Sequence, residues 1–323
     1  MKAALISRYG PPSVIKVAET PTPRPGPGDV LVRVHATSVS RTDCGELEPH
    51  PPVLARLMYG LRAPRRSIFG VDFAGVVEAV GDDVTALKIG DRVFGLCPGR
   101  RNGGQAQYVC ISEGGPIARL PEQVAFENGV VCEGAYYADA CLKAFDLKPG
   151  RKLLIYGAGG AIGSSAVQLA KLTGAEVTAV VATHHVALAH SLGADRVIDY
   201  LKEDFATLGQ IFDFALDAVG KTTFFKCRKI LKADGAFAAT DMGPGGQNLF
   251  LLAWSSITAN GRVAMAIPKR ESAPAFVRRM SNLLESGQFH AVIDRTYSLD
   301  AIADAYRYVA SGRKTGIVVV TPG

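Results

Sequence analysis

Hydrophobic residues follow two different spacings along this chain of 323 residues. Before about residue 120 they gather in short runs that Gly, Pro and Asp interrupt, which is typical of strands in a small barrel or sandwich. A proline-rich stretch at 21–28 can neither complete a strand ladder nor continue a helix, so it predicts an extended turn. The predicted strands cover residues 3–6, 30–35, 75–80, 91–95 and 107–111.

From residue 152 onward, short apolar strands alternate with helical patterns. This alternation predicts a parallel sheet with helical crossovers, the doubly wound arrangement. The end of the chain offers a β stretch at 291–294, a helix at 299–309 and a β-branched stretch at 315–321, which either extend this sheet or return to the first domain. The other predicted strands are 152–156, 176–181, 196–199, 212–217, 236–240 and 263–267, and the other helices are 161–172 and 185–192.

Length and composition indicate the class of protein. With 48% hydrophobic and 20% charged residues the chain is globular, and 323 residues are too many for one ordinary core, so we expect two domains. The six cysteines form no CxxC pair, and there is no run of about eighteen apolar residues. We therefore expect free thiols, no membrane span and a cytoplasmic location.

Arginines account for much of the formal net charge of +6. They gather at positions 56, 62, 65 and 66 and again at 100 and 101. A solvated loop is the simpler interpretation, and a patch that attracts phosphate, nucleic acid or anionic lipid is the alternative. Because no aromatic residues interleave at stacking spacing, we expect no nucleic-acid partner.

The most specific motif joins a buried-type strand, a glycine turn and the first turn of a helix. Glycine admits positive φ and lets a diphosphate approach main-chain N–H groups at the positive end of a helix. The strict GxGxxG spacing fails, whereas Gly157, Gly160 and Gly163 fit a GxxGxxG variant. Between a strand and a helix, this turn predicts a dinucleotide site. The predicted contacts are Gly157, Ala158, Gly159, Gly160, Ala161 and Ile162.

The residues after the next predicted strand indicate which nicotinamide nucleotide binds. An Asp or Glu at this point would hold the unphosphorylated ribose of NADH. The stretch 181–185 contains no acid, so we expect NADPH. It contains no Arg or Lys either, which leaves Thr183, His184 and Tyr200 as contacts for the phosphate. Either His184 or His185 could instead simply open a surface helix.

Nearly the whole chain resembles the zinc-independent quinone-oxidoreductase branch of the medium-chain dehydrogenase/reductase superfamily. The matching segments, in order, are residues 30–43, 70–77, 90–95, 103–108, 157–171 and 192–200. The resemblance implies an α/β protein in which a doubly wound Rossmann sheet is inserted into a GroES-like β-barrel domain. It places the GroES-like substrate domain at 1–122 and 285–323 and the NADP-binding domain at 123–284. It also implies a homodimer that uses NADPH to reduce a quinone, an enone or a related α,β-unsaturated carbonyl.

Two ligand positions of the zinc-dependent relatives are changed. In those relatives a cysteine begins the segment that here begins with Ser40, and Gly-His-Glu stands where this chain has Gly70, Val71 and Asp72. Catalytic zinc needs about three protein ligands, so we expect no metal, although an unusual site made from Asp43 and Cys44 is conceivable. Without a metal, a conjugated carbonyl is the favoured substrate because it spreads the incoming charge.

The resemblance also suggests which side chains meet the substrate. Ser40 stands where many relatives have an asparagine beside the nicotinamide, and Thr42 and Asp43 follow on the same loop, although Asp43 is equally suited to cap the next turn. Tyr137 falls on a usual threonine, where a phenol could donate a proton, but buried tyrosines in helices more often serve packing. The catalytic candidates are Ser40, Asp43 and Tyr137, and Met242 and Gly243 are expected to meet the nicotinamide amide.

Residues 50–68 mix apolar residues with arginines and are expected to form a lid over the substrate or a partner surface. Two further functions stay open. One is a zinc-free NADP-dependent alcohol dehydrogenase, which would turn over simple alcohols. The other is a weakly catalytic NADPH-binding sensor or an RNA- or membrane-associated protein, which would bind NADPH without turnover.

Overall fold

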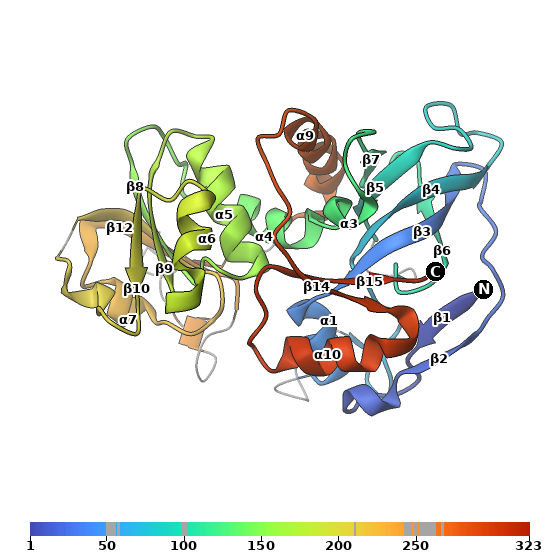
Figure 1. Cartoon of the computed structure of the whole chain (residues 1–323), viewed down its shortest axis with the longest axis horizontal. Helices are drawn as coiled ribbons and strands as arrows, with labels where there is room; N and C mark the ends of the chain where they lie inside the picture. The colour runs from blue at the N-terminus through green and yellow to red at the C-terminus, as the bar shows by residue number, and fades with distance from the viewer. Residues whose placement is uncertain are drawn as a thin grey trace. The chain divides into compact units, whose positions relative to one another are not determined.

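The computed structural model describes residues 1–49, 56, 59–97, 103–209, 211–241, 247–248, 251, 263–265 and 268–323. The chain forms two compact units (Figure 1). The first unit combines both ends of the chain, Met1–Glu133 and Glu271–Gly323, and the second is Gly134–Arg270. The expected boundary at 122/123 thus compares with one at 133/134, which lies inside helix α4 (Cys132–Ala144), and the expected boundary at 284/285 compares with one at 270/271.

The first unit is built on a largely antiparallel sheet of seven strands in the order β14-β15-β3-β4-β5-β7, with β6 beside β3. β3 is the longest strand and pairs with three others, β4, β6 and β15. Strands β1 and β2 form a separate antiparallel pair. The strands of this unit are β1 (Lys2–Leu5), β2 (Lys16–Glu19), β3 (Asp29–Val39), β4 (Asp72–Val80), β5 (Arg92–Leu96), β6 (Tyr108–Ser112), β7 (Ile117–Arg119), β14 (Ile293–Ser298) and β15 (Ile317–Thr321).

The C-terminal β stretch returns to the first unit and does not extend the Rossmann sheet. β15 pairs antiparallel with β3, with Val318 opposite Val39. Its run of β-branched residues is buried throughout Ile317–Val320 because it lies inside the sheet. The helices of the unit are η1 (Pro12–Val14), α1 (Arg41–Leu47), α3 (Phe126–Gly129), the start of α4, η5 (Arg270–Ser272), α9 (Ala273–Glu285), η6 (Leu299–Ala301) and α10 (Ile302–Ala310).

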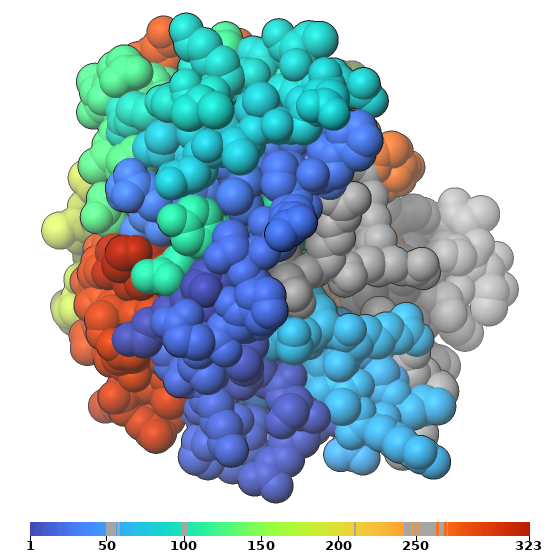
Figure 2. All heavy atoms as spheres, turned by 90° about the vertical axis from the view of Figure 1, so that its right-hand side faces the viewer, coloured from blue at the N-terminus to red at the C-terminus, as the bar shows by residue number. Residues whose placement is uncertain are grey.

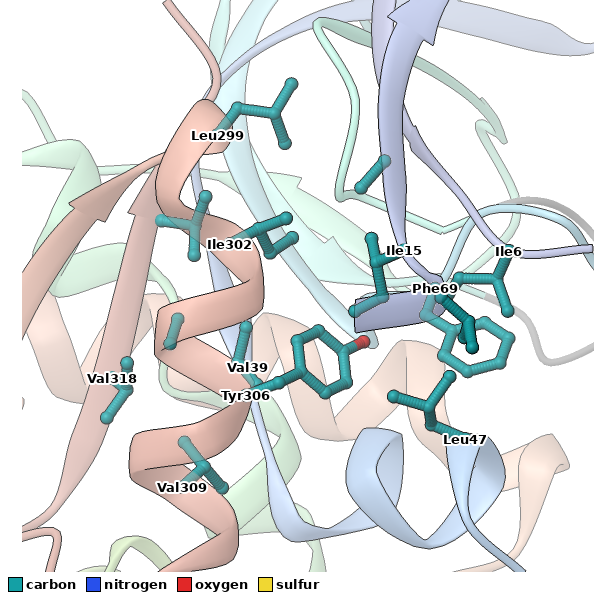
Figure 3. Close-up of a cluster of buried hydrophobic side chains, with 14 residues drawn as sticks. Ile6, Ile15, Val39, Leu47, Phe69, Leu299, Ile302, Tyr306, Val309 and Val318 are labelled. Atoms are coloured by element: carbon teal, nitrogen blue, oxygen red, sulfur yellow. The ribbon is translucent and has the colours of Figure 1, made fainter. Parts of the chain in front are cut away.

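One hydrophobic cluster of this unit joins the first and last thirds of the sequence (Figure 3). It combines Leu47 of α1 and Phe69 with Tyr306 of α10. The fully buried Tyr306 ring donates its hydroxyl to Oε1 of Gln105 at 2.9 Å, so its polar atom is satisfied inside the core. The helices α1 and α10 are therefore fixed on the same core, although about 260 residues separate them along the chain.

The second unit is a sheet of six parallel strands in the order β10-β9-β8-β11-β12-β13. Leu153, Leu154 and Ile155 of β8 are all fully buried, as expected of a central strand covered on both faces. Its strands are β8 (Lys152–Tyr156), β9 (Glu176–Val181), β10 (Arg196–Asp199), β11 (Phe212–Asp217), β12 (Leu231–Ala239) and β13 (Val263–Met265). Its helices are the rest of α4, α5 (Ala161–Lys171), η2 (Thr183–His185), α6 (Val186–Ser191), η3 (Phe205–Thr207) and α7 (Phe224–Cys227).

The parallel order brings the carboxyl ends of β8, β9, β10 and β11 to one edge of the sheet. In open α/β sheets ligands bind outside this edge. The residues that follow these strands are therefore candidates for contact with a nucleotide. Among the helices that the structure describes, none is both long and apolar enough to cross a membrane.

Candidate active site

The glycine turn after β8 leaves no room for side chains at two positions. Gly157 has φ of +83°, and a Cβ there would lie 2.6 Å from the Cγ atoms of Val219. A Cβ on Gly163 would lie 2.2 Å from the carbonyl oxygen of Gly157, so only glycine lets α5 approach the turn this closely. The first N–H groups of a helix have no intrahelical partner. This end of α5 is therefore suited to bind a diphosphate.

Two residues outside the motif pack against the turn. A Cβ on Gly159 would lie 2.6 Å from Nδ1 of His185, so the imidazole covers this glycine. Val219, from the loop after β11, covers Gly157 in the same way. The predicted contact His184 is exposed, and its ring lies against that of His185 with 4.0 Å between centroids. Sequence reasoning missed His185 and Val219. Their positions after β9 and β11, the two strands that flank β8, are the signal that could have found them.

An acid lies beside residues 181–185, the stretch from which the cofactor was predicted. Thr183 Oγ1 donates to Oδ2 of Asp199, at the end of β10, over 2.6 Å. This hydrogen bond, together with the N–H of Leu201 and with Lys202, lowers the pKa of Asp199. The structure thus brings to Thr183 a carboxylate that the sequence of residues 181–185 does not contain.

Tyr200 follows Asp199 directly and is 45% exposed. Its ring stacks on that of Tyr156, which ends β8, with 6.0 Å between centroids. The predicted contacts Thr183 and Tyr200 thus lie at one sheet edge with the glycine turn. The predicted contacts Met242 and Gly243 lie outside the described residues.

In the first unit, Ser40 and Asp43 hold each other at the start of α1. Ser40 is the N-cap residue, and its hydroxyl accepts the N–H of Asp43 at 3.1 Å while Oδ2 of Asp43 accepts the N–H of Ser40 at 2.9 Å. This is a capping box. Oδ1 of Asp43 also accepts the N–H of Gly70 at 3.0 Å. The predicted catalytic pair therefore has a structural task at this position, in addition to any contact with substrate.

Two more carboxyl groups lie buried beside this cap. Asp72 Oδ1 accepts the N–H of Glu133 at 2.8 Å, and Oδ2 accepts the hydroxyl of Ser38 at 3.2 Å. The Glu133 carboxyl accepts the hydroxyl of Thr42 at 2.6 Å. Sequence reasoning named Asp72 only in the segment that replaces the Gly-His-Glu of the zinc-dependent relatives, and it did not single out Glu133. It could not, because the contact between Thr42 and Glu133 spans 91 positions of the chain.

Burial sets the ionisation of these acids. It is the largest cause that raises the pKa of Asp43, of Asp72 and of Glu133. The negative charge of Glu133 raises the pKa of Asp72 further. Arg66, in contrast, lowers the pKa of Asp43. Crowded buried carboxyls with few cations favour the protonated form of at least one member.

Tyr137 lies half-buried in α4. Its neighbour Tyr136 is buried and donates its hydroxyl to the carbonyl oxygen of Lys269. Tyr136 therefore packs with a satisfied hydroxyl. The proton-donor role of Tyr137 stays a prediction.

The expected lid is described only from Gly60 onward, apart from Arg56 and Tyr59. This segment, light blue in Figure 2, lies beside the N-terminal strands, and Ile6 donates its N–H to the carbonyl of Ser67 at 2.8 Å. Arg66 is buried, with Nε and Nη2 bound to the Glu46 carboxylate at 3.1 and 2.5 Å. Arg66 is therefore already paired inside its own unit.

The donor set around Ser40 does not suit a catalytic zinc ion. The Ser40 hydroxyl is engaged in the capping box, and Val71 carries no donor atom. Cys132 is fully buried, and burial raises the pKa of its thiol well above the usual value, whereas zinc binds the thiolate. Within the described part of the chain, no three His, Cys, Asp or Glu side chains are arranged to hold a metal ion.

Two family models match the chain. Residues 26–122 match the alcohol dehydrogenase GroES-like domain, and residues 192–320 match a family described as zinc-binding dehydrogenase. The first match lies within the antiparallel unit and the second runs from the parallel sheet to the C-terminal strand. The residues that fit poorly with zinc therefore occur in a chain whose second half resembles proteins described as zinc-binding.

Relatives that match the whole length of the chain include quinone and alkenal/one oxidoreductases. The chloroplastic quinone-oxidoreductase QR1 of Triphysaria versicolor is 30% identical, over 100% of this chain and 98% of that protein. The chloroplastic NADPH-dependent alkenal/one oxidoreductase of Arabidopsis thaliana is 29% identical over 100% of this chain and 80% of its own. The quinone oxidoreductase of Coxiella burnetii superimposes with a TM-score of 0.85 at 25% identity, covering 100% and 99% of the two chains.

The fold, the domain matches and the full-length similarity all indicate the same protein family. The antiparallel GroES-like unit and the parallel Rossmann-like sheet are the two parts that the resemblance implied. The chain is an oxidoreductase and belongs to the quinone-oxidoreductase-like branch of the medium-chain dehydrogenase/reductase superfamily.

Proposed function

We propose that this protein is an NADPH-dependent reductase that transfers hydride to a quinone, an enone or a related α,β-unsaturated carbonyl without zinc. The observation that carries the proposal is the turn Gly157–Gly163, where side chains would collide with Val219, His185 or the turn itself. Such a backbone cradle at the N-terminus of a helix suits a dinucleotide diphosphate.

Different residues would bind different parts of the nucleotide. Main-chain N–H groups at the start of α5 would bind the diphosphate, and Thr183 and Tyr200 would meet the phosphorylated adenosine ribose. When bound, the reduced nicotinamide supplies the hydride. His185 and Val219 line the turn and would exclude water from the diphosphate.

The proposed choice of substrate follows from the donor set. A simple ketone gains from polarisation by a metal ion, and the residues around Ser40 offer no set of ligands for one. A conjugated carbonyl delocalises the incoming charge, so that hydrogen-bond donors suffice. Thr42, whose hydroxyl lies beside the Glu133 carboxyl, is such a donor.

Two observations favour the proposed preference for NADPH, and one acid limits it. A full-length relative is named as NADPH-dependent, and Lys202 lies 3.4 Å from Asp199 at the same sheet edge. Asp199 itself would repel a ribose phosphate, so we expect a moderate preference rather than exclusion of NADH. The cytoplasmic location and the homodimer remain predictions, to be tested by fractionation and by size-exclusion chromatography.

Titration with NADPH and NADH, followed by a substrate panel with and without a chelator, tests the proposal. We expect tighter binding of NADPH, turnover of enones and quinones, and no loss of activity on chelation. Turnover of simple alcohols instead would indicate an alcohol dehydrogenase. Activity that disappears with the chelator and returns with zinc would contradict the zinc-free mechanism, and failure to bind either nucleotide would contradict the whole proposal.

A further inference from the structure

The three buried carboxyl groups beside the start of α1, those of Asp43, Asp72 and Glu133, have different hydrogen-bond donors. Asp43 and Asp72 are bound by backbone N–H groups, from Ser40 and Gly70 in one case and from Glu133 in the other. A backbone N–H can only donate, so it requires an acceptor oxygen at all times. Protonation at these oxygens would break a buried hydrogen bond. Both oxygens of Asp43 are held in this way. Asp72 is held in this way at Oδ1, and its Oδ2 accepts the hydroxyl of Ser38, which is itself buried.

Glu133 differs because its carboxyl accepts the hydroxyl of a residue that is only half-buried, Thr42. Thr42 Oγ1 lies 2.6 Å from Oε1 of Glu133, and the Ser40 hydroxyl also acts on this carboxyl. A hydroxyl can donate or accept, so the Thr42–Glu133 hydrogen bond persists whether Glu133 is ionised or neutral. Glu133 is buried and Thr42 is half-buried, which makes the hydroxyl the accessible end of the pair.

The charges that face Glu133 do not hold it in the ionised form. Burial is the largest cause that raises its pKa, and Asp43 adds to the rise, whereas Thr42, Lys314 and Ser40 oppose it. Burial in turn lowers the pKa of Lys314, the main cation that acts on Glu133. Glu133 is thus an acid that can stay protonated, and Lys314 is a titratable amine that acts on it.

We propose that Thr42 passes a proton from Glu133 to the substrate after hydride transfer; this rests on the reductase function proposed above. Hydride addition to the β-carbon of an enone forms a C–H bond and leaves an enolate. The Thr42 hydroxyl gives its proton to the enolate as Glu133 gives its own proton to Thr42 Oγ1. Glu133 is left as a carboxylate and regains a proton from solvent, with Lys314 as the neighbouring amine. Each turnover consumes one hydride and one proton.

Comparison of two substrates tests this transfer. Hydride addition to a quinone leaves a hydroquinone anion, a much weaker base than an enolate, which needs no buried donor. In Glu133→Gln the kcat for an enone should fall by ~10²- to 10⁴-fold, whereas the kcat for a quinone should change by less than about tenfold. In the wild type, the kcat for the enone should fall as pH rises through the pKa of Glu133, and Glu133→Gln should lose this dependence.

Variants of the partner separate proton transfer from folding. Thr42→Val should reproduce the selective loss with enones, and Thr42→Ser, which keeps the hydroxyl, should restore activity. Glu122→Gln is the matched control, because its side chain is 90% exposed. Infrared difference spectra of the nucleotide-free protein give a readout without turnover: a protonated carboxyl that titrates above the usual range for glutamate should be missing from Glu133→Gln.

The outcomes distinguish the two proposals. A wild type that reduces neither substrate contradicts the reductase function, while the infrared titration still tests the state of Glu133. An active wild type with a Glu133→Gln variant that is equally active on enones, or that loses both substrates alike, overturns the proton transfer alone. An ordinary glutamate pKa in the infrared titration overturns it as well.

Discussion

The candidate sites of the two units depend on opposite features, missing side chains in one and buried charged side chains in the other. In the second unit, the turn Gly157–Gly163 depends on missing side chains, because a Cβ on Gly157, Gly159 or Gly163 would collide with Val219, His185 or the backbone of the turn. In the first unit, Asp43, Asp72, Glu133 and the pair Arg66–Glu46 bring charged side chains into a protein interior. The first kind of site tolerates no added atoms at its crowded glycines, and the second tolerates no removal of one charge from a buried pair.

Removal of a buried charge from the first unit should have the largest effect. Replacing Arg66 by Met leaves the buried Glu46 carboxylate without its partner, and breaking such a pair costs about 3–5 kcal/mol of unfolding free energy. Urea denaturation measures this loss. The exposed neighbour Arg65 provides the control, since Arg65→Ala should change stability by less than about 0.5 kcal/mol.

A double variant sharpens this test. Replacing Glu46 by Leu together with Arg66 by Met removes both charges and should recover most of the lost stability. Equal losses in the single and double variants would show that packing of the Arg66 side chain on the Phe69 ring, 5.1 Å away, outweighs its charge.

Addition of one methyl group is the matching experiment in the second unit. Gly163→Ala places a Cβ 2.2 Å from the Gly157 carbonyl oxygen, which must force α5 away from the turn and cost about 3 kcal/mol. The control is Gly160→Ala, whose Cβ would find its nearest atom at 3.7 Å, so the loss should be about 1 kcal/mol or less. Thermal unfolding and NADPH titration should be measured for both. If Gly163→Ala melted and bound NADPH like the wild type, the cradle would not be tight.

The second unit also contains a buried carboxylate, Asp213, so buried charge is not confined to the first unit. Burial alone would raise its pKa, but the N–H of Lys152 and the cations Lys232 and Arg151 lower the pKa to about 2 from 3.8. A depressed pKa stabilises the fold above 3.8, and this contribution disappears as pH falls through about 2. The difference corresponds to about 2 kcal/mol.

Asp213→Asn should therefore lose about 2 kcal/mol at neutral pH and almost nothing near pH 2. Urea midpoints of wild type and variant at both pH values measure this. A deficit that stayed constant across pH would mean that the hydrogen bond from the Lys152 N–H, and not the charge, stabilises the site.

The same contrast explains what the sequence revealed. The proposed nucleotide contacts are contiguous residues, Lys152–Gly163, together with Thr183 and Tyr200 just after the next strands. Spacing alone therefore predicted that they lie at one edge of the sheet. His185 escaped because its packing on Gly159 depends on the path of the loop after β9. In the first unit, Asp43 was predicted from its place in a motif.

The partners of the first-unit acids come from remote segments. Glu133 meets Asp72 across 61 positions and Thr42 across 91, and no periodicity encodes such contacts. The place of the C-terminal strand likewise depended on a pairing, Val318 with Val39, that a β-branched run does not specify. The sequence thus predicted the folds of the two units and the place of the glycine turn, but not the partners of the buried acids.

The smallest expected effect concerns the choice of cofactor, where the two kinds of site meet in one place. Asp199 is a charged side chain at the edge of the backbone cradle, and its hydrogen bond to Thr183 brings a negative charge beside the proposed ribose phosphate. Asp199→Asn keeps an acceptor oxygen for Thr183 and for the N–H of Leu201 but removes the charge. The preference for NADPH over NADH, measured as the ratio of kcat/KM values, should rise by about fivefold because the repulsion is partly screened by water. Glu203→Gln is the matched control, since this acid of the same loop pairs with Arg196 and should leave the ratio unchanged. A ratio that falls in Asp199→Asn would mean that the carboxylate serves the ribose phosphate only through the orientation of Thr183, and that its charge counts for little.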